Sequence, residues 1–164
     1  MQSSDHNRLI IRVILFLFLF SSQNAFSQEE KKSLVFSMFP KRPVEECRKL
    51  LLKGDTMAYY DLYWTLADQK RDADYFFYSL FMIDKYNYRT AHYWAYMSVL
   101  FFYKDNKIPL DGQALNLALE HLMKGAEFDI SGALIELGEL YQKGMYVPQD
   151  TIKGAELREK GRRK

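Results

Sequence analysis

The chain has 164 residues, of which 48% are hydrophobic and 16% aromatic, so it is long enough to bury the core of a single domain. Its 23 basic and 21 acidic residues leave a net charge of +2, which excludes the strongly basic surface typical of nucleic-acid-binding proteins. A basic run appears only in residues 158–164, where cations suit the end of a helix. We therefore predict no nucleic-acid partner.

Residues 1–27 have the pattern of a secretory signal peptide. Two arginines flank an apolar run that ends at residue 20, and a small-x-small motif ends at Ser27. The run is shorter than the roughly 20 apolar residues that a membrane-spanning helix needs. We expect cleavage between Ser27 and Gln28, with no stable membrane span in the mature chain. An uncleaved membrane anchor is the alternative.

Residues 28–42 are predicted to form an extended lead-in. The segment is polar except for the apolar residues within 34–39, which we expect to dock on the first helices. The pattern then becomes helical at Pro43, which suits the first turn of a helix because its missing N–H is not needed there. Residues 43–164 are predicted to form one helical repeat domain.

Apolar residues recurring every three and four positions, together with stop residues, predict seven helices in this domain. They span 43–53, 57–68, 72–85, 90–104, 111–127, 132–143 and 150–161. The segment 72–83 is rich in aromatic residues, which are common in strands, but its place between two helices favours a helix. The predicted fold class is therefore all-α.

Three stretches of the domain superpose at a shared small residue, namely Ala58, Ala91 and Ala133, with spacings of 33 and 42 residues. Repetition at this period is typical of a helical solenoid. The last stretch, 133–150, reads ALIELGELYQKGMYVPQD. It combines a mid-helix glycine, a glycine that ends the helix, and a Val-Pro-x-Asp sequence whose Asp150 is the expected N-cap of a second helix.

This pattern resembles the Sel1-like repeat, a relative of the tetratricopeptide repeat in which helix-turn-helix units stack into a solenoid. The resemblance covers 44–161 and implies a short α-solenoid of about three units, with the 43–53 helix as an extra second helix at the front. The first two units depart from the pattern at one position, because Tyr63 and Tyr96 stand where the last unit has Gly138.

The resemblance also implies that the first helix of each unit lines a concave surface. The positions expected there are Tyr60, Trp64, Ala67 and Asp68 in the first unit, Tyr93, Met97, Leu100 and Phe101 in the second, and Ile135, Glu139, Gln142 and Lys143 in the third. Aromatic and methionine side chains supply much of the contact area in protein interfaces. We predict that Tyr60, Trp64, Tyr93, Met97 and Phe101 form a partner-binding groove. Two alternatives stay open: the groove closes on itself, or residues 34–39 fill it.

Aromatic residues at helical spacing also build cores, so some of them are expected inside. The residues predicted to be buried are Tyr59, Tyr63, Phe76, Phe77 and Phe81. In the second helices of the units, the predicted packing faces are Phe76, Leu80 and Ile83 in one and Ala118, Leu122 and Ala126 in the next.

Few residues of the mature chain could do chemistry. His92 and His121 lie far apart in the sequence, and no HExxH, CxxC, GxSxG or glycine-rich phosphate loop occurs. Cys47 is the only cysteine, and its apolar helical surroundings favour a buried, inert thiol. The three aspartates within 68–74 fit helix capping better than a calcium loop. We predict no catalytic residue, no cofactor and no metal, and a protein that is not an enzyme.

Together these features predict an exported, non-catalytic adaptor or scaffold that binds a peptide or protein segment in its aromatic groove. Signal peptides of this form and Sel1-like repeats are both common in bacteria, so the periplasm is the expected location. An immunity-type inhibitor of a toxin is one alternative, although its rim would carry strong charge of a single sign. A cell-envelope enzyme is another, and it would need an acid, base or metal set. Self-association through exposed apolar surface is a third.

Overall fold

The computed structural model describes residues 42–164, which form seven helices and no strand. The helices are α2 (Val44–Leu51), α3 (Thr56–Asp68), α4 (Asp72–Tyr86), α5 (Ala91–Asp105), α6 (Gly112–Glu127), α7 (Ser131–Lys143) and α8 (Thr151–Arg162). The all-α prediction is thus confirmed for this range. The predicted signal peptide, its cleavage between Ser27 and Gln28, and the lead-in as far as Lys41 lie outside the described residues. Within the described range, no helix is long and apolar enough to span a bilayer.

Every helix begins and ends within two residues of its predicted position. Local capping explains this agreement. Asp55, Asp111 and Asp150 each accept a hydrogen bond from the backbone N–H three residues later, at 2.8–2.9 Å, and so begin α3, α6 and α8. At the end of α7, Gly144 has φ of 63°, a left-handed conformation that glycine adopts without steric cost.

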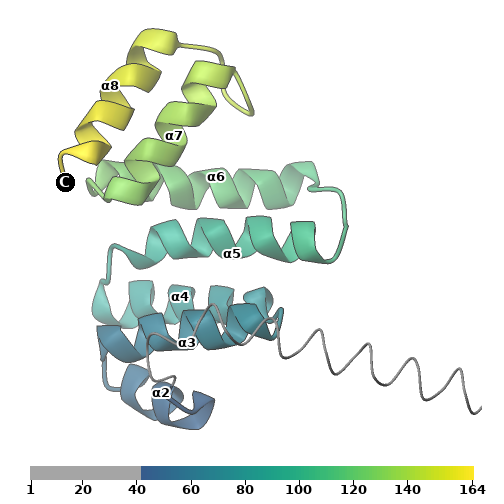
Figure 1. Ribbon diagram of the computed structural model, residues 1–164, viewed down its shortest axis with the longest axis vertical. Helices are drawn as coiled ribbons and strands as arrows, with labels where there is room; N and C mark the ends of the chain where they lie inside the picture. The colour runs from purple at the N-terminus through teal and green to yellow at the C-terminus, as the bar shows by residue number, and fades with distance from the viewer. Residues whose placement is uncertain (1–41) are drawn as a thin grey trace, which may run out of the picture. The chain divides into compact units, whose positions relative to one another are not determined.

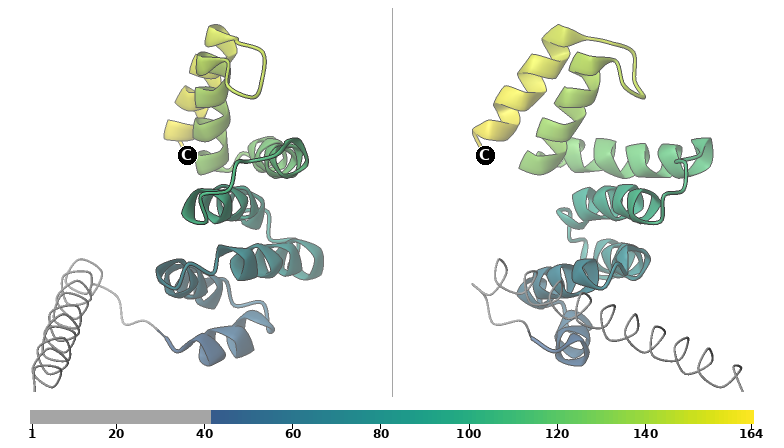
Figure 2. Two further views of the ribbon diagram at one scale, coloured as in Figure 1. Left: turned by 90° about the vertical axis from the view of Figure 1, so that its right-hand side faces the viewer. Right: turned by 45° about the vertical axis from the view of Figure 1, so that its right-hand side comes forward.

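The helices pack mainly against their neighbours in the chain. In Figure 1, α5 and α6 run side by side, whereas α7 and α8 form a pair inclined steeply to them. The left panel of Figure 2 shows α3, α5 and α7 on one side of the domain and α4 and α6 on the other. Among consecutive helices, the contact is most extensive between α7 and α8 and least extensive between α3 and α4.

Two clusters of buried side chains form the core of residues 42–164. The N-terminal cluster comprises Cys47, Leu51, Ala58, Tyr59, Leu62, Tyr63, Leu66, Tyr75, Met82 and Ala91. The C-terminal cluster comprises Tyr96, Val99, Ala118, Leu119, Leu122, Ala126, Ala133, Leu134, Leu137, Leu140 and Val147. The three alanines that align the predicted units, at positions 58, 91 and 133, are all fully buried. A small side chain at these points lets neighbouring helices approach.

The core predictions hold for α3 and α6 but are partly wrong for α4. Tyr59 and Tyr63 are buried, as are the predicted α6 face residues, Ala118, Leu122 and Ala126. In contrast, Phe77 is 67% exposed.

The buried face of α4 consists of Tyr75, Ser79 and Met82, and the predicted face of Phe76, Leu80 and Ile83 is only partly buried, as is Phe81. The helix is therefore rotated by one residue, about 100°, from the expected orientation. This rotation places Phe77 roughly opposite the side that packs.

Candidate interaction surface

The predicted groove residues come from two helices, α3 and α5, that share one side of the domain (Figure 2). Trp64 is 45% exposed, and the other four, Tyr60, Tyr93, Met97 and Phe101, are partly buried. We call these five residues the aromatic face. Met97 packs against the C-terminal core cluster and Phe101 against the N-terminal cluster. The face therefore extends across the boundary between the two clusters, and much of it rests on the core beneath.

Trp94 holds this face together, although sequence reasoning did not select it. Its ring centroid lies 5.9 Å from that of Tyr60 and 5.5 Å from that of Tyr93. Its distance to the ring of Tyr63 is 4.3 Å, and Tyr63 in turn lies 4.9 Å from Trp64. Five aromatic rings thus form one continuous array between α3 and α5. Geometries of this kind add about 0.5–1.5 kcal/mol per pair beyond burial.

The position of Trp94 in the predicted repeat explains why it was not among the predicted groove residues. It lies three residues after Ala91, which is not one of the positions that the resemblance assigns to the concave surface. Its indole Nε1 is buried and has no hydrogen-bond partner among the described residues. Its contact with Tyr63 could have been predicted only with knowledge of how α3 and α5 cross, which the sequence does not give.

Tyr63 and Tyr96 fill space where the last unit has a glycine. Tyr63 is buried between Trp94 and Tyr75, whose ring centroids lie 4.3 and 5.1 Å away. Tyr96 is 2% exposed, and its hydroxyl donates to Oε1 of Glu136 at 3.4 Å. Tyr63 lies in α3 and Tyr96 in α5, and the contact of α3 with α4 and of α5 with α6 is less extensive than that of α7 with α8, where Gly138 permits a close approach.

Three tyrosines of this region, Tyr63, Tyr88 and Tyr93, have a pKa raised above the ordinary value of 10 by burial. Burial raises the pKa of Tyr63 to about 12. Burial and a hydrogen bond with Tyr60 raise the pKa of Tyr88 to about 12, and the Tyr88 hydroxyl donates to the Tyr60 hydroxyl at 3.4 Å. The surface therefore offers aromatic rings and neutral hydroxyls, which suit apolar contact with single hydrogen bonds.

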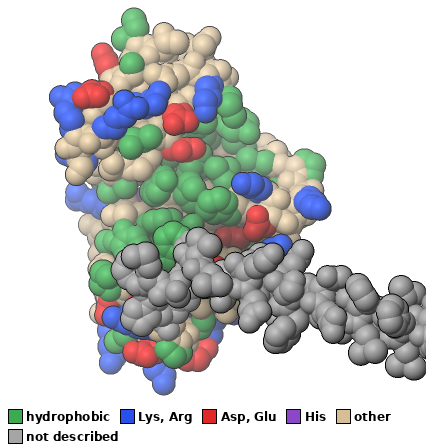
Figure 3. Space-filling view, viewed as in Figure 1, with side chains coloured by type: hydrophobic (Ala, Val, Ile, Leu, Met, Phe, Trp, Pro, Cys, Tyr) green, Lys and Arg blue, Asp and Glu red, His purple; other side chains and the backbone are tan. Residues whose placement is uncertain are grey.

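Helix α7 contributes a polar continuation of this side. Lys143 donates to Glu139 at 3.0 Å, and this hydrogen bond lowers the pKa of Glu139. Gln142 accepts from Arg158 of α8 at 2.6 Å, and Ile135 is partly buried. Figure 3 shows hydrophobic side chains gathered across the middle of this side and charged ones toward α7 and α8. Along this side, hydrophobic side chains therefore give way to charged ones from α3 and α5 toward α7.

The remaining candidates for chemistry are the two histidines, Cys47 and the aspartates at the start of α4. His92 and His121, far apart in sequence, meet with their Nδ1 atoms 3.0 Å apart. Burial raises the pKa of the Cys47 thiol, which is fully buried as predicted. No group of three metal-ligating side chains occurs in residues 42–164. Asp72 begins α4 and Asp74 pairs with Arg71, so both serve the helix start.

No protein-family model, no curated protein and no solved structure matches this chain.

Proposed function

We propose that this chain is an exported, non-catalytic protein-interaction module whose helices form a short Sel1-like α-solenoid. Support for the solenoid comes from the packing of each helix on its chain neighbours and from three fully buried alanines at repeat-like spacing. Each helix pair would bury its apolar side only by stacking on the next, as repeat architectures require.

The observation that carries the binding role is the aromatic face. Large rings on α3 and α5 contact one another in a continuous array, and Trp64 remains 45% exposed at its edge. Aromatic anchors held rigidly in this way lose little conformational entropy when a partner binds. Neutral phenols and few charges favour a partner segment that presents apolar side chains, either extended or as a helix.

The test is affinity capture from the native cell envelope with the full chain as bait, followed by mass spectrometry. We expect one dominant partner that is lost with the variant Trp64→Ala/Tyr93→Ala. Tyr146→Ala is the matched control, because Tyr146 is 53% exposed and lies in the connection between α7 and α8.

Circular dichroism checks that the double variant keeps the helix content of the wild type. If the double variant loses helix content, the single variant Trp64→Glu replaces it in the capture experiment. Capture of the same partner by the folded groove variant would contradict the proposed face. Recovery of the bait alone would indicate self-association instead.

Export is a separate part of the proposal and rests on residues 1–27. N-terminal sequencing of the protein recovered from the cell envelope should begin at Gln28. A chain that retains its first residues and fractionates with the membrane would favour the uncleaved anchor.

A further inference from the structure

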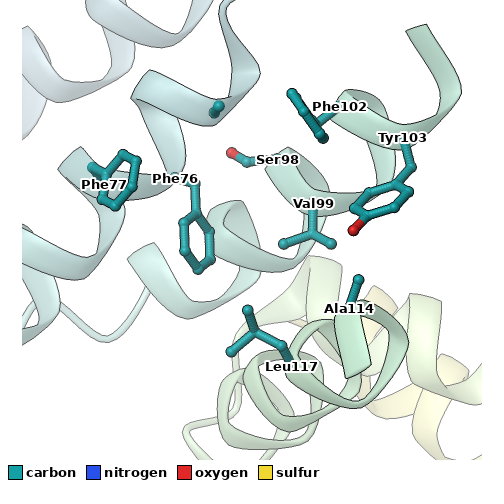
Figure 4. A pocket seen from close by; sticks show the side chains of 9 residues that line it. Phe76, Phe77, Ser98, Val99, Phe102, Tyr103, Ala114 and Leu117 are labelled. Atoms are coloured by element: carbon teal, nitrogen blue, oxygen red, sulfur yellow. The ribbon is translucent and has the colours of Figure 1, made fainter. Parts of the chain in front are cut away.

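A pocket outside the aromatic face opens where α4, α5 and α6 meet (Figure 4). Its volume is about 190 Å³, and it is lined in part by Phe76 and Phe77 of α4, Val99 and Phe102 of α5, and Leu117 of α6. No residue of the aromatic face lines it. The pocket is therefore a separate feature of the domain, built on the helices α4 and α6 that lie on the other side (Figure 2).

The lining selects an apolar group of limited size. Ser98 lies in the wall, but its hydroxyl already donates to the carbonyl oxygen of Trp94 at 2.8 Å. A polar group entering this pocket would lose its hydrogen bonds to water and gain few in return, which is unfavourable. An apolar cavity of about 150 Å³ holds one benzene molecule. The present volume therefore matches one aromatic ring or one branched aliphatic side chain.

The open rim favours a protein side chain over an enclosed small molecule. Phe77 is 67% exposed and Leu117 is 40% exposed, so apolar surface continues outward from the pocket. Pockets for drug-sized ligands typically measure about 300–1,000 Å³ and bury most of the ligand, which this one could not do. A single anchor side chain surrounded by further apolar contact is the usual arrangement at protein interfaces.

Two aspartates close in sequence to lining residues of the pocket indicate the charge of the occupant. Asp72 directly precedes the lining residue Ala73, and Asp105 lies one turn after Phe102. Asp72 is only 4% exposed, and neither carboxylate forms an ion pair within residues 42–164. Burial, together with the nearby charge of Asp105, raises the pKa of Asp72. A cation supplied from outside would relieve this unfavourable pairing.

We propose that this pocket is a second docking site, which receives one aromatic or branched aliphatic side chain of a partner protein. A lysine or arginine of the same partner segment lies beside the anchor, against the exposed Asp105 and close to the charge of the buried Asp72.

A library of displayed random peptides, selected on the full chain, tests both features. We expect enriched peptides to share one large apolar residue with a lysine or arginine close to it. In synthetic copies of such peptides, replacing the apolar residue by alanine should weaken binding at least about tenfold. Replacing the basic residue by glutamine should weaken binding by a smaller factor.

Variants of the protein locate the binding. Ala73→Phe adds a ring at an exposed lining position and should abolish binding, whereas Ala155→Phe, at an exposed position on α8, should not. Asp105→Asn should weaken binding, whereas Asp84→Asn, exposed at the far end of α4, should leave it unchanged.

The selection also separates this site from the aromatic face. Peptides whose binding is lost with Trp64→Ala but kept with Ala73→Phe would overturn the second site and leave the first intact. Enrichment of acidic or wholly polar peptides, or no enrichment at all, would likewise overturn it.

Discussion

At the scale of single residues, two glycines decide how closely α7 and α8 approach. A Cβ atom added to Gly138 would lie 2.7 Å from the carbonyl oxygen of Gly154, and one added to Gly154 would lie 2.7 Å from that of Gly138. Contacts of this kind involve backbone on both sides, so no side chain can move away to relieve them. The mid-helix glycines thus permit a packing distance that alanine would not.

Gly138→Ala should therefore destabilise the domain. Overpacking costs about 1–3 kcal/mol, and the better helix propensity of alanine offsets up to about 1 kcal/mol of it. We expect a net loss of about 1–2 kcal/mol in the free energy of unfolding, measured by urea denaturation. Gly112→Ala is the control, because no atom lies within 4 Å of its added Cβ, and it should be neutral or slightly stabilising. Equal stability of both variants would show that α7 and α8 can separate at little cost.

Asp72 is a second residue of interest, because its surroundings oppose the charge of its carboxylate. Burial and the charge of Asp105 raise its pKa from 3.8, so the folded state holds the proton more tightly than the unfolded state. At neutral pH both states are ionised, and the folded state carries the cost. Stability should therefore rise as the pH falls through the raised pKa.

Asp72→Asn removes this charge and should raise the midpoint of thermal unfolding at neutral pH. Its advantage over the wild type should shrink as the medium becomes acidic. Asp84→Asn, an exposed change on the same helix, should do neither. A lower midpoint for Asp72→Asn would mean that the favourable position of Asp72 in the first turn of α4 outweighs its burial.

At the scale of elements, a histidine pair joins α5 to α6. The Nδ1 atoms of His92 and His121 lie 3.0 Å apart, so a hydrogen bond forms between them only while one Nδ1 carries a proton and the other does not. Burial lowers the pKa of both rings from 6.5, and for His92 the neighbouring His121 and Lys124 add to the effect. Glu120 and Glu127 act in the opposite direction.

The pH dependence follows from the sign of these shifts. Above the unfolded value of 6.5 both rings are neutral in either state, and the pair contributes its full stability. As the pH falls below that value, the unfolded chain binds protons first, so stability is lost until the folded rings also titrate.

The midpoint of thermal unfolding should fall as the pH is lowered from about 7.5 to about 5. His121→Gln should reduce this slope. Glu120→Gln removes a group that raises both histidine pKa values, and it should leave the slope as steep or steeper. An unchanged slope in His121→Gln would assign the acid sensitivity to other groups.

At the scale of the whole described domain, the core is divided between two clusters. Leu62 is fully buried in the N-terminal cluster, and Leu134 is 1% exposed in the C-terminal cluster. Because helices pack mainly on their chain neighbours, few contacts carry a disturbance from one cluster to the other. Local unfolding should therefore be largely confined to the helices of one cluster at a time.

Leu62→Ala and Leu134→Ala should each cost about 2–5 kcal/mol, but in different places. By hydrogen-deuterium exchange with mass spectrometry, Leu62→Ala should speed exchange chiefly in α2 to α4. Leu134→Ala should do so chiefly in α6 to α8. If both variants speed exchange equally along all seven helices, the domain opens as a single cooperative unit.

The amino-acid sequence by itself determined the helices and their ends. Signals such as the N-cap Asp150 and the terminal Gly144 act within one turn of the backbone, so they need no knowledge of neighbouring helices. The repeat spacing that aligns Ala58 with Ala133 was also visible in the sequence, and both alanines are fully buried.

Tertiary structure alone decided which side of α4 is buried. A rotation of one residue in α4 exposes Phe77 and buries Tyr75, a change that the apolar pattern of this aromatic-rich helix does not resolve. The placement of Trp94 at the centre of the aromatic face, and the meeting of His92 with His121, likewise depend on how helices cross. Crossing angles arise from the shapes of side chains on both helices together, and so they cannot be derived from either segment alone.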